Sequence, residues 1–157
     1  MFAEVIRGRF GGKAAVDSGP YVLPDAATIG LPLLDQAHAA LLARLNAAHR
    51  ALSSGHEAEA RLLLEMLRSD LVTHFDIEEQ IMQGLGFAGM RDQVRRHAAN
   101  TAQFDEICRA SLARGSFTVA DLDLCFQNLI DEVMRGDVDL KSHFQTMGSR
   151  RAAQEGA

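Results

Sequence analysis

One stretch of the chain combines a long helical repeat with two polar groups on the inward side. Between residues 67 and 85, one set of positions recurs at steps of three or four: Leu67, Leu71, His74, Glu78, Met82 and Leu85. That spacing places side chains on one face of an α-helix. Burying the imidazole and carboxylate one turn apart is unfavourable unless a partner satisfies both. A metal ion would do so, and so would a His–Glu hydrogen bond at the solvated end of a bundle; this motif alone leaves both open.

The same periodicity continues through the rest of the chain after Pro32. It predicts helices at about 35–53, 57–84, 90–114 and 118–146, the first capped by Asp35, with breaks at Ser53–Gly55, Gly84–Gly86 and Gly115–Ser116. Short connections make successive helices antiparallel neighbours. The expected fold is therefore an all-α, up-down-up-down four-helix bundle over residues 21–146. A Gly-rich flexible arm is expected at 1–20 and a C-terminal tail at 147–157.

Composition restricts the class of protein. The 157 residues are 47% hydrophobic and 24% charged, which is typical of one globular domain. No apolar run approaches the roughly 20 residues of a membrane span, and a net charge of −5 argues against nucleic acid or a membrane surface as partner. The absence of a signal-peptide core favours the cytoplasm. In that compartment Cys108 and Cys125 are expected as reduced buried thiols, with a redox-switched disulfide as the alternative.

The antiparallel topology brings the polar inward residues to one end of the bundle. They come from the start of the first helix, the end of the second, the start of the third and the end of the fourth: His38, His74, Glu78, Gln93, His97 and Asp139. A single inward histidine is commonly a satisfied core residue. Three histidines and two carboxylates at one level indicate a bound cation.

At these positions the chain resembles the hemerythrin-like family, of bacteriohemerythrin type, over about residues 23–146. The matching pieces are Ile29-Gly30-Leu31-Pro32-Leu33-Leu34-Asp35-Gln36-Ala37-His38, His74-Phe75-Asp76-Ile77-Glu78-Glu79-Gln80-Ile81-Met82, Gly86-Phe87 leading to His97, and Asp139. The resemblance implies a pair of non-heme irons that binds oxygen reversibly, held by five histidines and two bridging carboxylates. His38 and His74 match the histidines of one iron, Glu78 and Asp139 the bridging carboxylates, and His97 one histidine of the other iron.

Two of the usual histidines are replaced. Gln93 occupies one slot and Met134 the other; shifting the last helix by one residue would instead put Arg135 in the histidine slot and Leu140 in the carboxylate slot. The first register is preferred because it keeps Asp139. Ferrous iron binds amide oxygen weakly and thioether poorly, so one well-held iron is expected and the second position weak or empty. Glu79 points about 100° away from Glu78, behind the ligands or at the surface.

The expected function is that of a non-heme iron protein, not an enzyme. It would bind oxygen or another small diatomic ligand, or sense oxygen, redox state or iron supply. The alternatives are a metal-free interaction module and an iron-dependent oxidase or peroxidase. The N-terminal arm is the expected site for a protein partner, and dimerisation through it is left open.

Overall fold

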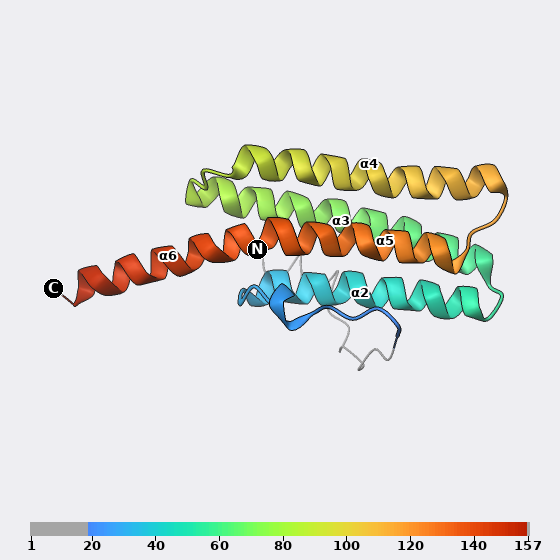
Figure 1. The fold of residues 1–157 in the computed structure, drawn as a ribbon, viewed down its shortest axis with the longest axis horizontal. Helices are drawn as coiled ribbons and strands as arrows, with labels where there is room; N and C mark the ends of the chain where they lie inside the picture. The colour runs from blue at the N-terminus through green and yellow to red at the C-terminus, as the bar shows by residue number, and fades with distance from the viewer. Residues whose placement is uncertain (1–18, 157) are drawn as a thin grey trace.

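The computed structural model describes residues 19–156, so the predicted arm lies almost entirely outside the described part of the chain. Three long helices, α2 (Pro32–Ser53), α3 (Glu57–Leu85) and α4 (Met90–Arg114), are followed by a last helix in three pieces. These pieces are α5 (Val119–Glu132), the π-helical η2 (Val133–Asp137) and α6 (Val138–Glu155), and a short 3₁₀ turn, η1 (Asp25–Ala27), precedes α2. Figure 1 shows the long helices lying side by side and alternating in direction. The predicted all-α four-helix bundle is confirmed.

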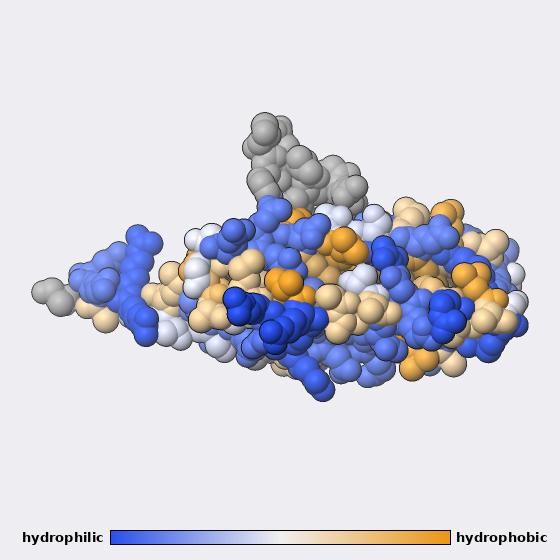
Figure 2. Space-filling view, turned by 90° about the horizontal axis from the view of Figure 1, so that it is seen from above, coloured by the Kyte–Doolittle hydropathy of each residue, from blue (hydrophilic) through white to orange (hydrophobic). Residues whose placement is uncertain are grey.

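The last helix is longer than the sequence pattern predicted. It continues to Glu155, so most of the predicted tail at 147–157 is helical, and residues 145–156 are exposed. Figure 1 shows this part of α6 projecting beyond the other helices, and Figure 2 shows its surface to be mainly hydrophilic. None of the helices in the described part of the chain is long and apolar enough to cross a membrane.

The start of α2 differs from the expected cap. The helix begins at Pro32, three residues before Asp35, because proline's fixed φ and missing N–H suit the first helical position. The Asp35 carboxylate instead accepts hydrogen bonds from the backbone N–H groups of Ile29 (2.8 Å) and Gly30 (3.0 Å). Asp35 therefore fastens the preceding segment to the helix rather than capping it.

The segment before α2 is fixed to the bundle by reciprocal hydrogen bonds. The backbone N–H of Tyr21 donates to Asn46 Oδ1 (3.0 Å), and Asn46 Nδ2 donates to the Tyr21 carbonyl (2.9 Å). The Tyr21 hydroxyl donates to Asp123 Oδ1 (2.8 Å), and its ring packs on Phe126 at 4.9 Å between centroids. The chain from residue 19 to α2 is thus fastened to the bundle at Tyr21.

Two apolar clusters enclose a polar layer. The larger contains Leu41 of α2 and Phe75 of α3, and the smaller contains Leu34, Met82 and Leu140. On α2, His38 comes between Leu34 and Leu41 in the sequence, and on α3 the residues His74 to Glu78 come between Leu71 and Met82. The polar groups are therefore buried with apolar packing both above and below them.

The two cysteines are free thiols, Cys125 buried and Cys108 half-buried. Burial raises the pKa of both thiols, which keeps them protonated and weakly reactive. This supports the interpretation as buried reduced thiols.

A stability prediction arises at the start of α5. Thr118 and Asp121 form a capping box, and Arg114 Nη2 donates to the Asp121 carboxylate at 2.6 Å. Replacing Asp121 by Ala removes both interactions, so we expect the free energy of unfolding at pH 7 to fall by about 1–2 kcal/mol. Urea unfolding measures this, with Asp131→Ala as the exposed control on the same helix.

The same prediction has a pH dependence. Burial acts to raise the pKa of Asp121, but hydrogen bonds from Arg114 and Thr118 outweigh it and lower that pKa below the ordinary value. A depressed folded-state pKa contributes stability that is present above the unfolded pKa of about 3.9 and is lost as the pH falls through the folded value. The difference between wild type and Asp121→Ala should therefore narrow in acid. An equal difference at pH 7 and in acid would refute this account.

Candidate metal centre

Three buried donor atoms from two helices converge at one end of the bundle. His38 Nε2 and His74 Nε2 lie 3.0 Å apart, and Glu78 Oε1 lies 3.0 Å from His74 Nε2 and 3.9 Å from His38 Nε2. None of the three residues is more than 2% exposed. His38 comes from α2, while His74 and Glu78 lie one turn apart on α3, which is the placement that the sequence spacing predicted.

Hydrogen bonds among these three atoms cannot satisfy all of them at once. If His38 Nε2 carries the proton and donates to His74 Nε2, the lone pairs of His74 Nε2 and Glu78 Oε1 face each other at 3.0 Å. If His74 Nε2 carries it, that single proton serves only one of its two close neighbours. Glu78 Oε1 has no hydrogen-bond partner with acceptable geometry. One cation placed among the three atoms would satisfy all of them together.

The spacing fits a first-row metal ion. Donors at about 2.1 Å from an ion in octahedral geometry are about 3 Å apart when adjacent, and adjacent tetrahedral donors are somewhat further apart. Two of the three separations are 3.0 Å and the third is 3.9 Å. Imidazole and carboxylate together suit Fe²⁺ and Zn²⁺. His38, His74 and Glu78 could therefore hold such an ion without rearrangement of the helices.

The second carboxylate oxygen of Glu78 faces α4. Glu78 Oε2 lies 3.1 Å from His97 Nε2, and His97 Nδ1 lies 2.8 Å from Glu79 Oε1. The His97 ring also stacks on Phe75, with 4.0 Å between centroids and 7° between planes. Glu79 thus orients His97 from behind, which is how carboxylates commonly position metal-binding histidines.

The Glu78 carboxyl group is in the ionised form that binds a metal cation. Burial acts to raise the pKa of its carboxyl group, but the close imidazoles of His74 and His97 outweigh burial and hold that pKa well below its ordinary value. Glu78 is therefore ionised at neutral pH and presents one oxygen to α2 and α3 and the other to α4.

Glu132 is a buried carboxylate that sequence reasoning missed. It lies at the end of α5, is 7% exposed, and places Oε1 3.6 Å from His97 Nε2. Gln93 of α4 is 1% exposed and its Nε2 donates to the Gly136 carbonyl. The signal was present in the sequence, because Glu132 comes three residues after Leu129 and four before Gly136, on the inward side of the last helix.

Two predicted residues are not brought into this cluster. Asp139 is exposed, and its carboxylate lies 3.5 Å from Arg96 Nη2 instead of facing His97. Its neighbour Leu140 is buried in the small apolar cluster, and adjacent helical residues point about 100° apart, so Asp139 is turned outward. Met134 packs against the larger apolar cluster, and it is Gly136 that contacts Gln93. The expected placement of Asp139 among the inward ligands is therefore wrong, and Met134, expected in a histidine slot, packs against the apolar core.

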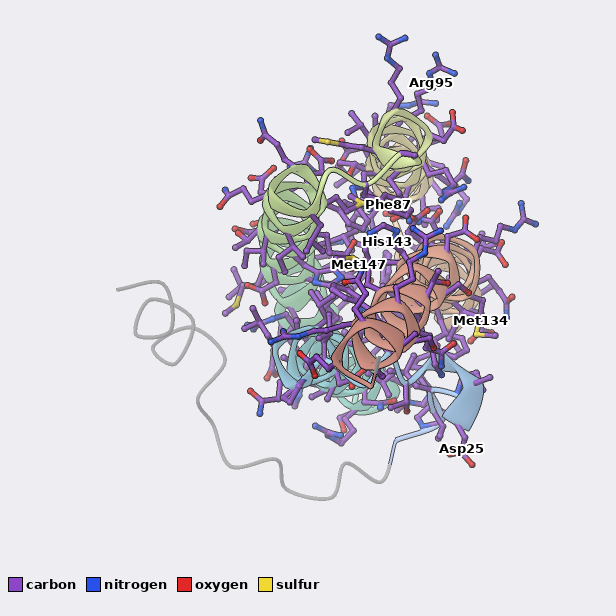
Figure 3. The ribbon with its side chains drawn as sticks, turned by 90° about the vertical axis from the view of Figure 1, so that its left-hand side faces the viewer. Asp25, Phe87, Arg95, Met134, His143 and Met147 are labelled. Carbon is purple, nitrogen blue, oxygen red and sulfur yellow. The ribbon has the colours of Figure 1, made fainter. Side chains whose placement is uncertain are left out.

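A small pocket lies beside His38. Its volume is about 90 Å³, and it is lined by His38, Asp35 and residues of the segment 23–28. At the end of the bundle Phe87 packs edge-on against His143 of α6, with 5.2 Å between ring centroids. Figure 3, which looks onto this end, shows Phe87 and His143 side by side. His143 thus packs against the turn that follows α3.

The fold and the buried cluster together define a metal-binding four-helix bundle. The model of the Hemerythrin HHE cation binding domain matches residues 30–146. The chain therefore belongs to the hemerythrin family, and the resemblance inferred from its motifs is confirmed. Comparison with curated proteins and with solved structures gave no match. That Gln93 and Met134 stand in slots usually filled by histidine stays a prediction.

Proposed function

We propose that this protein is a non-heme iron protein that binds dioxygen or another small diatomic ligand and reports oxygen, redox state or iron supply. The observation that carries the proposal is the convergence of His38, His74 and Glu78 at 3.0–3.9 Å, buried between two apolar clusters. Bound iron would supply an open coordination position and a change of oxidation state. The cluster's own residues supply the charge, the orientation and the exclusion of water.

Each of these contributions follows from contacts already described. Ionised Glu78 offsets the cation's charge, and Glu79 fixes the orientation of His97. Leu34 and Met82, both fully buried, close one side of the cluster against water. The small pocket beside His38 is large enough for a diatomic molecule but excludes larger substrates, which favours ligand binding over turnover of an organic substrate.

A sensing role has a structural basis in the last helix. Glu132, which lies 3.6 Å from His97 Nε2, directly precedes the π-helical turn that leads into α6. A change in charge at the cluster alters the position that Glu132 prefers, and the projecting part of α6 would carry that shift to a partner.

The test is metal content per chain in protein made without a chelating tag. We expect bound iron in the wild type, at least a tenfold loss in His74→Ala, and no change in His56→Ala, an exposed control near the start of α3. Circular dichroism must show that both variants are folded. Wild-type protein without metal would leave the metal-free interaction module as the function, and turnover of peroxide with a reducing dye would favour the oxidase or peroxidase.

A further inference from the structure

We propose that residues 23–28, called the strap below, control the entry of small ligands to the metal, and that Lys141 of α6 holds the strap closed. The inference rests on the proposed function, because it assigns the route by which a diatomic ligand would reach the iron. Lys141 is a positioning residue in this account, since it acts on the strap and not on the metal. The contact would make ligand access depend on the last helix.

The strap forms one wall of the pocket beside His38. Five strap residues line this pocket of about 90 Å³, together with Asp35 and His38 of α2. His38 is one of the three proposed metal ligands and is only 2% exposed. A ligand that enters through this pocket therefore passes the strap before it reaches the metal.

The strap is held less firmly than the walls that the helices provide. Above and below the polar cluster, Leu34, Leu41 and Met82 are fully buried side chains of α2 and α3. In the strap, by contrast, Ala27 is buried, Leu23 is half-buried and the other four residues are exposed. Segments with few buried apolar contacts open locally at low free energy. Opening of the strap is therefore the easiest way to admit a ligand to His38.

Hydrogen bonds fix the strap at its ends and join it to α6. The ends are fixed by the hydrogen bonds of Tyr21 and Asp35 described above. At Thr28, the last residue of the strap, the carbonyl oxygen accepts a hydrogen bond from Lys141 Nζ at 2.9 Å. Because this bond is exposed, water can replace it when the strap opens. The Lys141 contact is thus suited to form and break reversibly.

The same contact couples the strap to the last helix. Lys141 directly follows Leu140, which is buried in the smaller apolar cluster. The turn η1, which is part of the strap, packs against η2, and Figure 3 shows Asp25 of η1 near Met134 of η2. A shift of α6 would therefore change how firmly the strap is held. By linkage, opening of the strap would in turn favour the shifted position of α6.

The alternatives are that Lys141 only stabilises the fold, or that its positive charge acts on the bound ligand. A strap that limits access changes the rates of ligand binding and release by the same factor and leaves the affinity unchanged, because neither the free nor the bound state is altered. A charge that acts on the bound ligand changes the affinity. A purely stabilising contact changes neither rate.

The experiment is anaerobic stopped-flow measurement of nitric oxide binding to, and release from, the iron-loaded full chain, followed by visible absorption. We expect Lys141→Met to speed both binding and release by about two- to fivefold, the size expected for one exposed charged contact, with an unchanged dissociation constant. Lys141→Arg should restore the wild-type rates, because its guanidinium can still donate to the Thr28 carbonyl.

Arg150→Met is the matched control, since it removes a positive charge from the exposed part of the same helix and should leave both rates unchanged. Iron content and urea unfolding of each variant show that it is loaded and folded.

The outcomes separate this inference from the proposed function. A wild-type chain that holds no iron, or whose iron binds no nitric oxide, would overturn the proposed ligand binding and the strap together. Normal binding of nitric oxide with wild-type rates in Lys141→Met would overturn only the strap. A changed dissociation constant in Lys141→Met would show that Lys141 acts on the bound ligand, and would also overturn the strap.

Discussion

Replacing Glu78 by Gln is expected to remove the bound metal while the metal-free bundle still folds. Glu78 is the one described residue whose two oxygens lie near both groups of donors, 3.0 Å from His74 Nε2 on one side and 3.1 Å from His97 Nε2 on the other. The amide removes the negative charge and turns one of the two acceptors into an N–H donor. Iron per chain should fall to less than about a tenth of the wild-type value.

The metal-free form should also lose stability, by about 1–3 kcal/mol, because the buried imidazoles lose the carboxylate they face. Elemental analysis and urea unfolding of the same preparation measure both effects. Glu65→Gln is the matched control, since it makes the same change on the exposed side of α3. Wild-type iron content in Glu78→Gln would contradict the assignment of Glu78 as a metal ligand.

Replacing Gly136 by Ala is expected to destabilise the metal-free bundle and to leave the metal held by His38, His74 and Glu78 in place. The added methyl group would lie where Gln93 Oε1 and Glu132 Oε1 now lie, so both side chains must move. His38 and His74 belong to other helices, and their spacing should not change. We expect the free energy of unfolding of the metal-free protein, measured in urea, to fall by about 1–3 kcal/mol, with the iron content per chain unchanged.

Gly148 offers a control on the same helix, because a Cβ there would meet nothing within 4 Å. Gly148→Ala should keep its iron and gain up to about 1 kcal/mol of stability from helix propensity. If Gly136→Ala were as stable as Gly148→Ala, the close packing of Gln93 and Glu132 against Gly136 would not contribute to the stability of the bundle.

The elements that the sequence predicted well are those that depend on local pattern. The first three helices were placed within a few residues, because their apolar spacing and their breaks at Gly55, Gly86 and Gly115 are local signals. His38, His74 and Glu78 were placed together because each lies on a strongly apolar stripe.

The last helix shows where this reasoning fails. At the level of the cluster, the residues on the inward side of this helix are Glu132, Gly136 and Leu140. A carboxylate and a glycine thus occupy positions where apolar residues would normally show which side of the helix faces inward. The rotation of the helix about its axis is instead set by a tertiary contact, the packing of Leu140 against Leu34 and Met82 in the small cluster. Choosing the register that kept Asp139 as a ligand therefore turned the helix the wrong way.

Anomalous diffraction at the iron absorption edge, from crystals of untagged protein loaded with Fe²⁺, would locate the metal directly. We expect a peak bounded by His38 Nε2, His74 Nε2 and Glu78 Oε1. Absence of a peak among these three atoms in iron-loaded crystals would contradict the assignment of this bundle end as a metal centre.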